Sequence, residues 1–169
     1  MKMINASGKD LDAQKFVDNL KDRYGNGIST KCLIYNATGK TLSLQTYNDW
    51  TGHIYDSPYP SDILNGQWGA FLHVHPAGSL VGSFGAVVYR ITGVCDLMFG
   101  WGIPYIGDNA VHTEIQEEGF FPLYNRWGYV KTMLETQGYT STDNRYGYVS
   151  KAEIGEGTSV NARAVFQLA

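Results

Sequence analysis

Apolar residues recur with two different periods along the chain, and together they predict two helices among many strands. Between Asp10 and Tyr24, apolar residues recur every three or four positions and charged residues fill the opposite side, which is typical of an amphipathic helix. A second helical pattern covers Arg126–Gln137. Each segment is followed by a glycine, Gly25 or Gly138, and glycine commonly ends helices.

Elsewhere, short runs of β-forming residues are separated by Gly, Pro, Asn or Ser. Lys31–Asn36 and Thr41–Tyr47 flank a turn signal at Asn36–Gly39, so we expect them to form an antiparallel hairpin. Further strands are predicted at Gln67–His75, Ser83–Arg90, Asp96–Trp101, Val111–Gln116, Gly147–Ile154 and Ala162–Leu168. This spacing favours a mainly β fold, an antiparallel β-sandwich with two short peripheral α-helices, as a single domain over residues 1–169.

The composition agrees with a compact β protein and argues against nucleic acid as a partner. Hydrophobic residues make up 43% of the chain and charged residues 17%, with 20 Gly and 12 Tyr, which suits strands and turns. There are 13 Lys and Arg against 16 Asp and Glu, so the net charge is -3. Proteins that bind nucleic acid backbones need a cluster of basic residues, and this sequence has no basic run.

The sequence predicts no transmembrane segment and a cytoplasmic location. The longest mainly apolar stretch, Trp68–Tyr89, is interrupted by His73, His75 and Pro76, well before the roughly 20 residues that a membrane helix needs. The first residues lack the apolar core of a secretory signal. In a reducing compartment, we expect the two cysteines, Cys32 and Cys95, to be buried free thiols.

Residue types used in catalysis occur, but their spacing specifies no active site. His73 and His75 would share one face of a strand and could hold a metal, yet no third ligand follows them. Ser83 lacks the glycine pattern of a hydrolase nucleophile. We therefore predict a non-enzymatic protein without a metal or cofactor. A small enzyme for a hydrophobic metabolite, with His73 or His75 in a closed pocket, is an alternative.

Aromatic residues in polar, loop-like surroundings are the strongest sign of binding. One group comprises Trp50, His53, Tyr55 and Tyr59, and the other Trp101, Tyr105, Asp108 and Asn109. Rings beside hydrogen-bonding side chains suit a sugar, through stacking, or a choline headgroup, through cation–π contact. The alternative is that these rings belong to the core of an aromatic-rich sandwich.

Three segments of this chain resemble the plant 23 kDa jasmonate-induced proteins. They are Leu33–Gly39, Asp49–Ile54 together with Ser57–Pro60, and Asn65–Val74. The resemblance begins near Asp10 and covers most of the chain. It implies a stress-induced plant protein and does not specify a reaction.

A second resemblance concerns architecture. The order of elements is similar to the actinoporin-like sandwich, a fold that also includes fungal fruit-body lectins. This order is a helix, paired strands, and then the segments Gly85–Tyr89, Leu97–Phe99 and Pro104–Tyr105. In actinoporins a phosphocholine headgroup is held at one end of the sandwich. The resemblance places the matching residues at Phe84, Gly100, Pro104 and Tyr105, where Phe84 and Gly100 depart from the usual smaller aliphatic and hydroxyl residues.

The actinoporin resemblance also implies an N-terminal helix that detaches to form pores. The acidic residues Asp12, Asp18 and Asp22 would be repelled by anionic lipids, so we expect the helix to pack against a sheet.

These observations favour a plant stress- or defence-related binding protein with lectin-like carbohydrate recognition. The alternative is an actinoporin-like protein that binds lipid headgroups or forms pores. The expected partner is a glycan or a lipid headgroup, and the exposed edges of a sandwich leave a homo-oligomer open.

Overall fold

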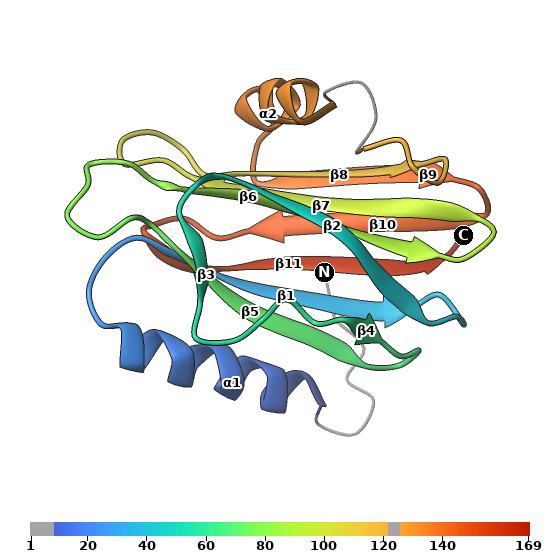
Figure 1. Cartoon of the computed structure of the whole chain (residues 1–169), viewed down its shortest axis with the longest axis horizontal. Helices are drawn as coiled ribbons and strands as arrows, with labels where there is room; N and C mark the ends of the chain where they lie inside the picture. Colours follow the sequence, from blue (N-terminus) through green and yellow to red (C-terminus); the bar gives the residue numbers. More distant parts are fainter. Residues whose placement is uncertain (1–8, 122–125) are drawn as a thin grey trace.

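The computed structural model describes residues 9–121 and 126–169, which form two sheets between two helices (Figure 1). The helices are α1 (Lys9–Tyr24) and α2 (Arg126–Thr136). Sheet A has the order β3 (His53–Tyr55), β5 (Trp68–Val74), β1 (Ser29–Ala37), β11 (Ser159–Leu168), β10 (Tyr148–Ile154), β9 (Thr140–Arg145). Sheet B has the order β4 (Asp62–Ile63), β2 (Leu42–Thr51), β6 (Ser83–Ile91), β7 (Cys95–Ile103), β8 (Ala110–Gln116).

The predicted mainly β sandwich with two peripheral helices is confirmed. Neighbouring strands are antiparallel except for the parallel pair β1 and β11. The predicted hairpin of β1 and β2 is wrong, because β1 pairs with β5 and β11 in sheet A and β2 pairs with β6 and β4 in sheet B. Strand β1 is mostly buried, so it lies within a sheet that another layer covers, whereas β2 is partly exposed along its length.

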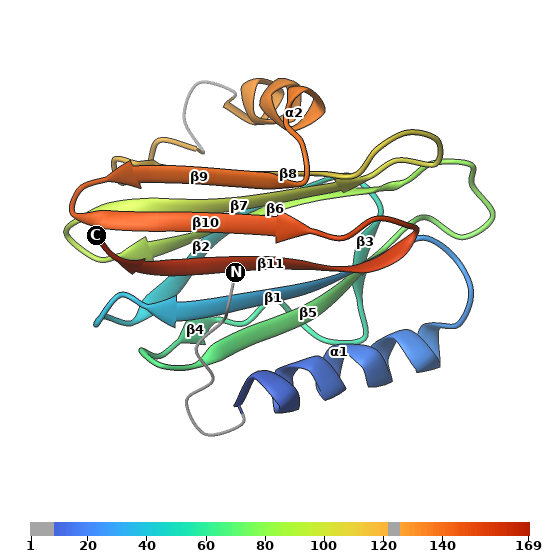
Figure 2. The same cartoon turned by 180° about the vertical axis from the view of Figure 1, so that it is seen from behind.

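The core lies between the two sheets, and each helix covers the outer face of one sheet (Figure 2). Helix α1 buries Val17 and Leu20 among apolar residues of β1 and β5. Helix α2 buries Val130 and Leu134 and contacts β7 and β8. The predicted packing of α1 on the body is therefore confirmed, as is the burial of Cys32 and Cys95 as free thiols.

Three strands lie outside the predicted set, for a common reason. Strands β3 and β4 have only 3 and 2 residues, and β9 contains only Thr, Ser, Asp, Asn and Arg. Such segments carry no alternating apolar pattern. Strand β9 lies beside β8 without a ladder, since Ser141 Oγ accepts from Thr113 N at 3.1 Å and Asp143 Oδ2 accepts from Ile115 N at 2.8 Å.

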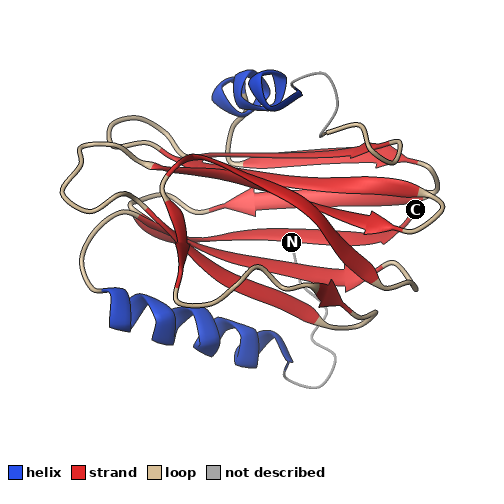
Figure 3. Ribbon diagram, in the orientation of Figure 1, coloured by secondary structure: helices blue, strands red, loops and turns tan. Residues whose placement is uncertain are grey.

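Loops gather at both ends of the sandwich (Figure 3). At one end, residues 25–28, 75–82, 104–109 and 155–158 come together, and we call this the loop end. Its segments are linked, because His75 N donates to Ile28 O at 3.0 Å and Asn109 Nδ2 donates to Gly155 O at 2.8 Å. The opposite end, which we call the turn end, carries the short connections 38–41, 92–94 and 146–147.

Within residues 9–121 and 126–169, no helix is both long enough and apolar enough to cross a bilayer.

Candidate functional site at the loop end

A hollow of about 240 Å³ opens at the loop end between two loops that are far apart in the sequence. Its lining residues are Pro104, Tyr105, Gly107, Asp108 and Asn109 before β8, Tyr139 before β9, and Glu156, Gly157 and Thr158 before β11. The structure therefore brings together Pro104, Tyr105, Asp108 and Asn109, four of the residues that the sequence proposed for ligand binding.

Asn109 holds the two sides of this hollow together. Its side-chain amide donates to Gly155 O at 2.8 Å and to Gly157 O at 2.7 Å. Gly107 and Gly157 have φ values of +119° and +109°, a backbone conformation that glycine adopts without strain. Asn109 is buried, and both hydrogens of its amide are used in these bonds, so it helps to fix the shape of the hollow.

The hollow has an anionic and aromatic lining. Its lining includes the carboxylates of Asp108 and Glu156 and the phenol rings of Tyr105 and Tyr139. None of its lining residues is Lys or Arg. The Tyr139 hydroxyl donates to Asp108 Oδ1 at 3.2 Å. Desolvation and then the charge of Asp108 raise the pKa of Tyr139, so this hydroxyl stays a hydrogen-bond donor at neutral pH. The lining is suited to a cation.

An apolar rim lies beside the hollow. Tyr105 and Ile106 are 50% and 85% exposed, and Leu80 and Val81 are 74% and 42% exposed. The two loops that carry them touch, because a Cβ on Gly82 would lie only 1.9 Å from Ile103 O. Adjacent exposed apolar pairs on two touching loops form a patch of the kind found at interaction sites.

Exposed apolar residues at the turn end are arranged differently. Leu64, Val94, Tyr146 and Leu168 are exposed there, and none of them is next in sequence to a second exposed large apolar residue. The guanidinium of Arg145 lies 5.5 Å from the Tyr146 ring centroid. Isolated apolar side chains are normal on protein surfaces, so the loop end is the stronger candidate for an interface.

The first predicted aromatic group is dispersed. Trp50 packs against Trp127 of α2 with ring centroids 6.0 Å apart, and Tyr55 packs against Tyr24 of α1 at 5.2 Å. Tyr59 lies in the core and donates to Asp49 Oδ1 at 2.8 Å. Only His53 is exposed. These four residues therefore do not form one ligand site.

Trp101 also lies away from the surface. It has 0% exposure and packs between Phe71 and Phe99, with ring centroids 5.4 and 5.6 Å away. The inward-facing residues of β7 alternate, and Trp101 continues the series of Leu97 and Phe99 into the core. We therefore correct its assignment from a ligand-stacking ring to a core residue.

The actinoporin resemblance placed Phe84 and Gly100 beside Pro104 and Tyr105, but the structure separates them. A Cβ on Gly102 would lie 2.5 Å from Phe84 Cε1, so the Phe84 ring already fills the space over this glycine. A Cβ on Gly100 would face Ala86 and the sulfur of Met98, which belong to the apolar cluster containing Val130 of α2. Phe84 and Gly100 thus line the α2 side of sheet B rather than the hollow.

His73 belongs to a polar network that joins the two sheets. Its Nε2 lies 3.1 Å from Asp49 Oδ1 and its Nδ1 2.7 Å from Ser83 Oγ. Because a carboxylate only accepts, Nε2 donates to Asp49 and Nδ1 accepts from Ser83. These are the residue types of a hydrolase triad, but Ser83 and His73 have no exposed surface, so a substrate cannot reach the hydroxyl.

His73 and His75 do not lie side by side on one strand face. Strand β5 ends at Val74, and the His75 ring lies instead beside Tyr24, with ring centroids 6.3 Å apart. Among the residues that the structure describes, no three His, Cys, Asp or Glu side chains are grouped to hold a metal.

The His73 network makes stability depend on pH. Burial holds the pKa of His73 below its ordinary value of 6.5, although Asp49 opposes this shift. Below about pH 6.5, the unfolded chain therefore binds a proton at this histidine more readily than the folded chain does. The free energy of unfolding should fall as the pH drops below this value. Urea unfolding at several pH values measures this fall.

Two variants serve as the comparison for this pH effect. His73→Gln, which cannot be protonated, is expected to be less stable at neutral pH and to lose much of the slope between pH 7 and 5. His53→Gln changes an exposed histidine and should keep the slope. An unchanged slope in His73→Gln would assign the effect to other groups.

Sequence reasoning missed Tyr139, Glu156, Gly157 and Thr158. Asn109 binds the backbone at Gly155 and Gly157, across 46 and 48 positions, and so holds the segment of Glu156–Thr158 at the hollow. Tyr139 is held by the hydrogen bond that its carbonyl accepts from Ile154 N. No local pattern reports such a contact. The sequence feature that came closest to indicating them was the carboxylate of Glu156 in a glycine-rich turn.

Comparison with known proteins agrees with the fold and the resemblance. A 23 kDa jasmonate-induced protein of Hordeum vulgare is 64% identical over 173 residues, which covers 99% of this chain and 82% of the relative. The crystal structure of the lipid-binding protein Nakanori superposes with a TM-score of 0.90 at 28% identity, covering 94% of this chain and 80% of Nakanori.

A more distant likeness concerns the fold alone. The Xerocomus chrysenteron lectin matches with a TM-score of 0.59 at 15% identity, over 83% of this chain and 97% of the lectin. The whole chain, residues 1–169, matches the family described as Nakanori-like protein. The predicted kinship with the 23 kDa jasmonate-induced proteins is thereby confirmed, and the chain belongs to the Nakanori-like family.

Proposed function

We propose that the protein is a non-enzymatic binding protein whose loop end binds the choline-type headgroup of a lipid at a membrane surface. The observation that carries the proposal is the anionic, aromatic hollow beside two exposed apolar pairs. The relatives support a binding protein, since Nakanori is a lipid-binding protein and superposes over 94% of this chain.

The hollow favours a quaternary ammonium over an anionic group. The faces of Tyr105 and Tyr139 can take an ammonium by cation–π contact, which contributes about 0.5–2 kcal/mol. Asp108 and Glu156 add opposite charge, and the lining holds no cationic side chain that could bind a free phosphate. An anionic headgroup alone would be repelled.

The apolar rim provides the second part of the binding energy. Ile106 and Leu80 are 85% and 74% exposed, so they can enter the boundary between headgroups and acyl chains without unfolding the loops. Burial of apolar groups there stabilises binding by about 0.8 kcal/mol per CH₂. Tyr105 combines an apolar ring with a polar hydroxyl, as aromatic residues at membrane interfaces do.

Binding of this kind does not need α1 to detach. The helix is held by Val17 and Leu20 and by polar contacts, since Lys31 Nζ lies 3.0 Å from Asp18 Oδ1 and Gln14 Nε2 donates to Asn161 Oδ1 at 3.0 Å. Pore formation would require these contacts to break. It is therefore not part of the proposal.

The proposal includes a role in plant stress and a cytoplasmic location. The stress role is supported by the barley relative, a jasmonate-induced protein. The location is supported by two buried thiols that stay unpaired. Imaging of the tagged full chain tests the location. The prediction of carbohydrate binding named both aromatic groups, and the group around Trp50 is dispersed.

Sedimentation with vesicles tests the proposed function. We expect the protein to bind phosphatidylcholine vesicles more tightly than phosphatidylglycerol vesicles, with free phosphocholine competing. Tyr105→Ala should weaken binding to phosphatidylcholine several-fold, because it removes one wall of the hollow. Tyr146→Ala, a matched exposed tyrosine at the turn end, should not. Equal binding to both lipids, or none, would contradict the proposal.

A further inference from the structure

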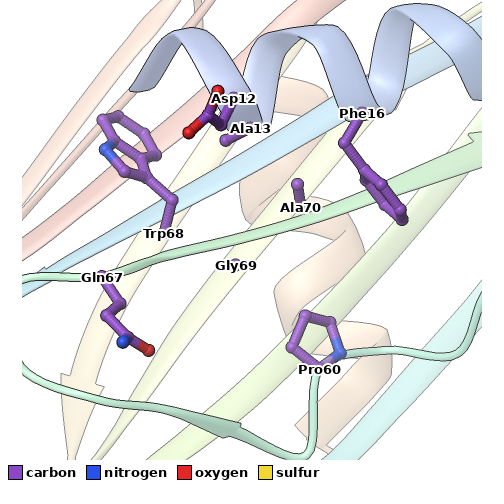
Figure 4. Close-up of a pocket in the computed structure, with 8 residues that line it drawn as sticks. All are labelled: Asp12, Ala13, Phe16, Pro60, Gln67, Trp68, Gly69 and Ala70. Atoms are coloured by element: carbon purple, nitrogen blue, oxygen red, sulfur yellow. The ribbon is translucent and has the colours of Figure 1, made fainter. Parts of the chain in front are cut away.

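A second hollow, of about 360 Å³, lies between α1 and the first half of β5 (Figure 4). Asp12, Ala13 and Phe16 line it from the helix, Gln67 to Ala70 line it from the strand, and Pro60 closes one side. We call it the helix groove. It shares no lining residue with the loop-end hollow.

Two aromatic rings stand on either side of the helix groove, with small residues between them. Trp68 and Phe16 are separated by Ala70 and Gly69 in Figure 4. Phe16 is 44% exposed although Val17 and Leu20 of the same helix are buried. The Trp68 ring packs against Tyr35, with ring centroids 5.0 Å apart, and also lines the groove.

Polar groups lie at the rim of these aromatic walls. The Asp12 carboxylate lies beside Trp68 in Figure 4, and Gln67, whose side chain extends from the strand away from the helix, also lines the groove. Both residues are exposed, and the lining contains no Lys or Arg. The site therefore offers acceptors and an amide donor, but no positive charge for an anionic ligand.

The edge of β5 adds backbone groups to the groove. Strand β3 pairs with β5 only at Leu72, His73 and Val74. In the described part of the chain, no strand pairs with β5 residues 68–71 on that side. An unpaired strand edge presents N–H and C=O groups, which are further partners for ligand hydroxyls.

We propose that the helix groove binds a neutral carbohydrate, with a pyranose face against Trp68 and hydroxyl groups on Asp12 and Gln67. A pyranose has an apolar face of C–H groups and a rim of hydroxyls, so it matches an aromatic wall with polar groups beside it. An acyl chain would gain no hydrogen bonds from the polar rim. This ligand class is distinct from the lipid headgroup proposed for the loop end.

A glycan array followed by titration tests this site. The purified full chain is applied to neutral plant and fungal oligosaccharides, and the best-bound glycan is titrated by calorimetry. We expect Asp12→Asn combined with Gln67→Ala to weaken its affinity about tenfold or more, through the loss of hydrogen bonds to hydroxyls. Trp68→Phe should abolish the ligand-induced change in tryptophan fluorescence.

Matched variants separate a local from a general effect. Asp22→Asn combined with Gln45→Ala changes the same residue types at other exposed positions and should leave glycan affinity unchanged. Tyr105→Ala should also leave it unchanged while weakening vesicle binding. Absence of glycan binding, wild-type affinity in the Asp12 and Gln67 variant, or loss of affinity in Tyr105→Ala would each overturn the proposal. An array without hits combined with an extended peptide bound at the groove would overturn it as well.

Discussion

Replacing Trp101 with alanine is expected to lower the free energy of unfolding by about 3–5 kcal/mol. The ring has no exposed surface and contacts the rings of Phe71, Phe99 and His73, the last at 5.2 Å between centroids. Its removal leaves a cavity that the two sheets cannot close completely. Urea denaturation of the wild type and the variant measures the difference.

Tyr105 provides the control for this experiment, because it lies four positions later and is 50% exposed. Tyr105→Ala should change the stability by no more than about 0.5 kcal/mol and yet reduce vesicle binding. If Trp101→Ala kept wild-type stability and lost ligand binding, the assignment of Trp101 to the core would be wrong.

The second large effect is expected at the tip of the loop end. Ile106→Asp should lower the affinity for phosphatidylcholine vesicles tenfold or more. The change removes an apolar side chain that is 85% exposed and places a carboxylate where the bilayer begins, where charge is unfavourable. Because the side chain makes few contacts in the free protein, the stability should stay within about 0.5 kcal/mol of the wild type.

A charge at the turn end distinguishes local insertion from a general change in surface charge. Val94 is 40% exposed, and Val94→Asp adds the same charge at the other end of the sandwich. Sedimentation with phosphatidylcholine vesicles should give wild-type affinity for this variant. Equal losses in the two variants would mean that net charge, rather than contact by the loop end, controls binding.

Much of the fold can be predicted from local patterns, but strand partners cannot. Runs of β-forming residues bounded by turn residues predicted eight of the strands, and helical spacing predicted α1 and α2 nearly to their ends. The turn signal at Asn36–Gly39 correctly predicts a chain reversal and says nothing of which sheet follows. Asn36 Nδ2 donates to Ile63 O at 2.8 Å, a tertiary contact that helps hold this crossing.

The candidate site was predictable only where its residues are neighbours in the sequence. Pro104, Tyr105, Asp108 and Asn109 stand on one loop, so a composition of rings and polar groups was enough to indicate them. Tyr139 and Glu156 join them through tertiary contacts. Trp101 was assigned to the ligand site because it stands next to the loop in the sequence. The alternation along β7, which places every second residue in the core, would have predicted its burial.

The most direct test of lipid contact by the loop end uses one fluorescent probe at each end of the sandwich. Ile106→Cys and Tyr146→Cys are labelled separately with an environment-sensitive nitrobenzoxadiazole group, since the native thiols of Cys32 and Cys95 are buried and do not compete. On adding phosphatidylcholine vesicles, the emission should shift to the blue and intensify at position 106 and stay unchanged at position 146. A shift at position 146 alone, or none at position 106, would contradict lipid binding by the loop end.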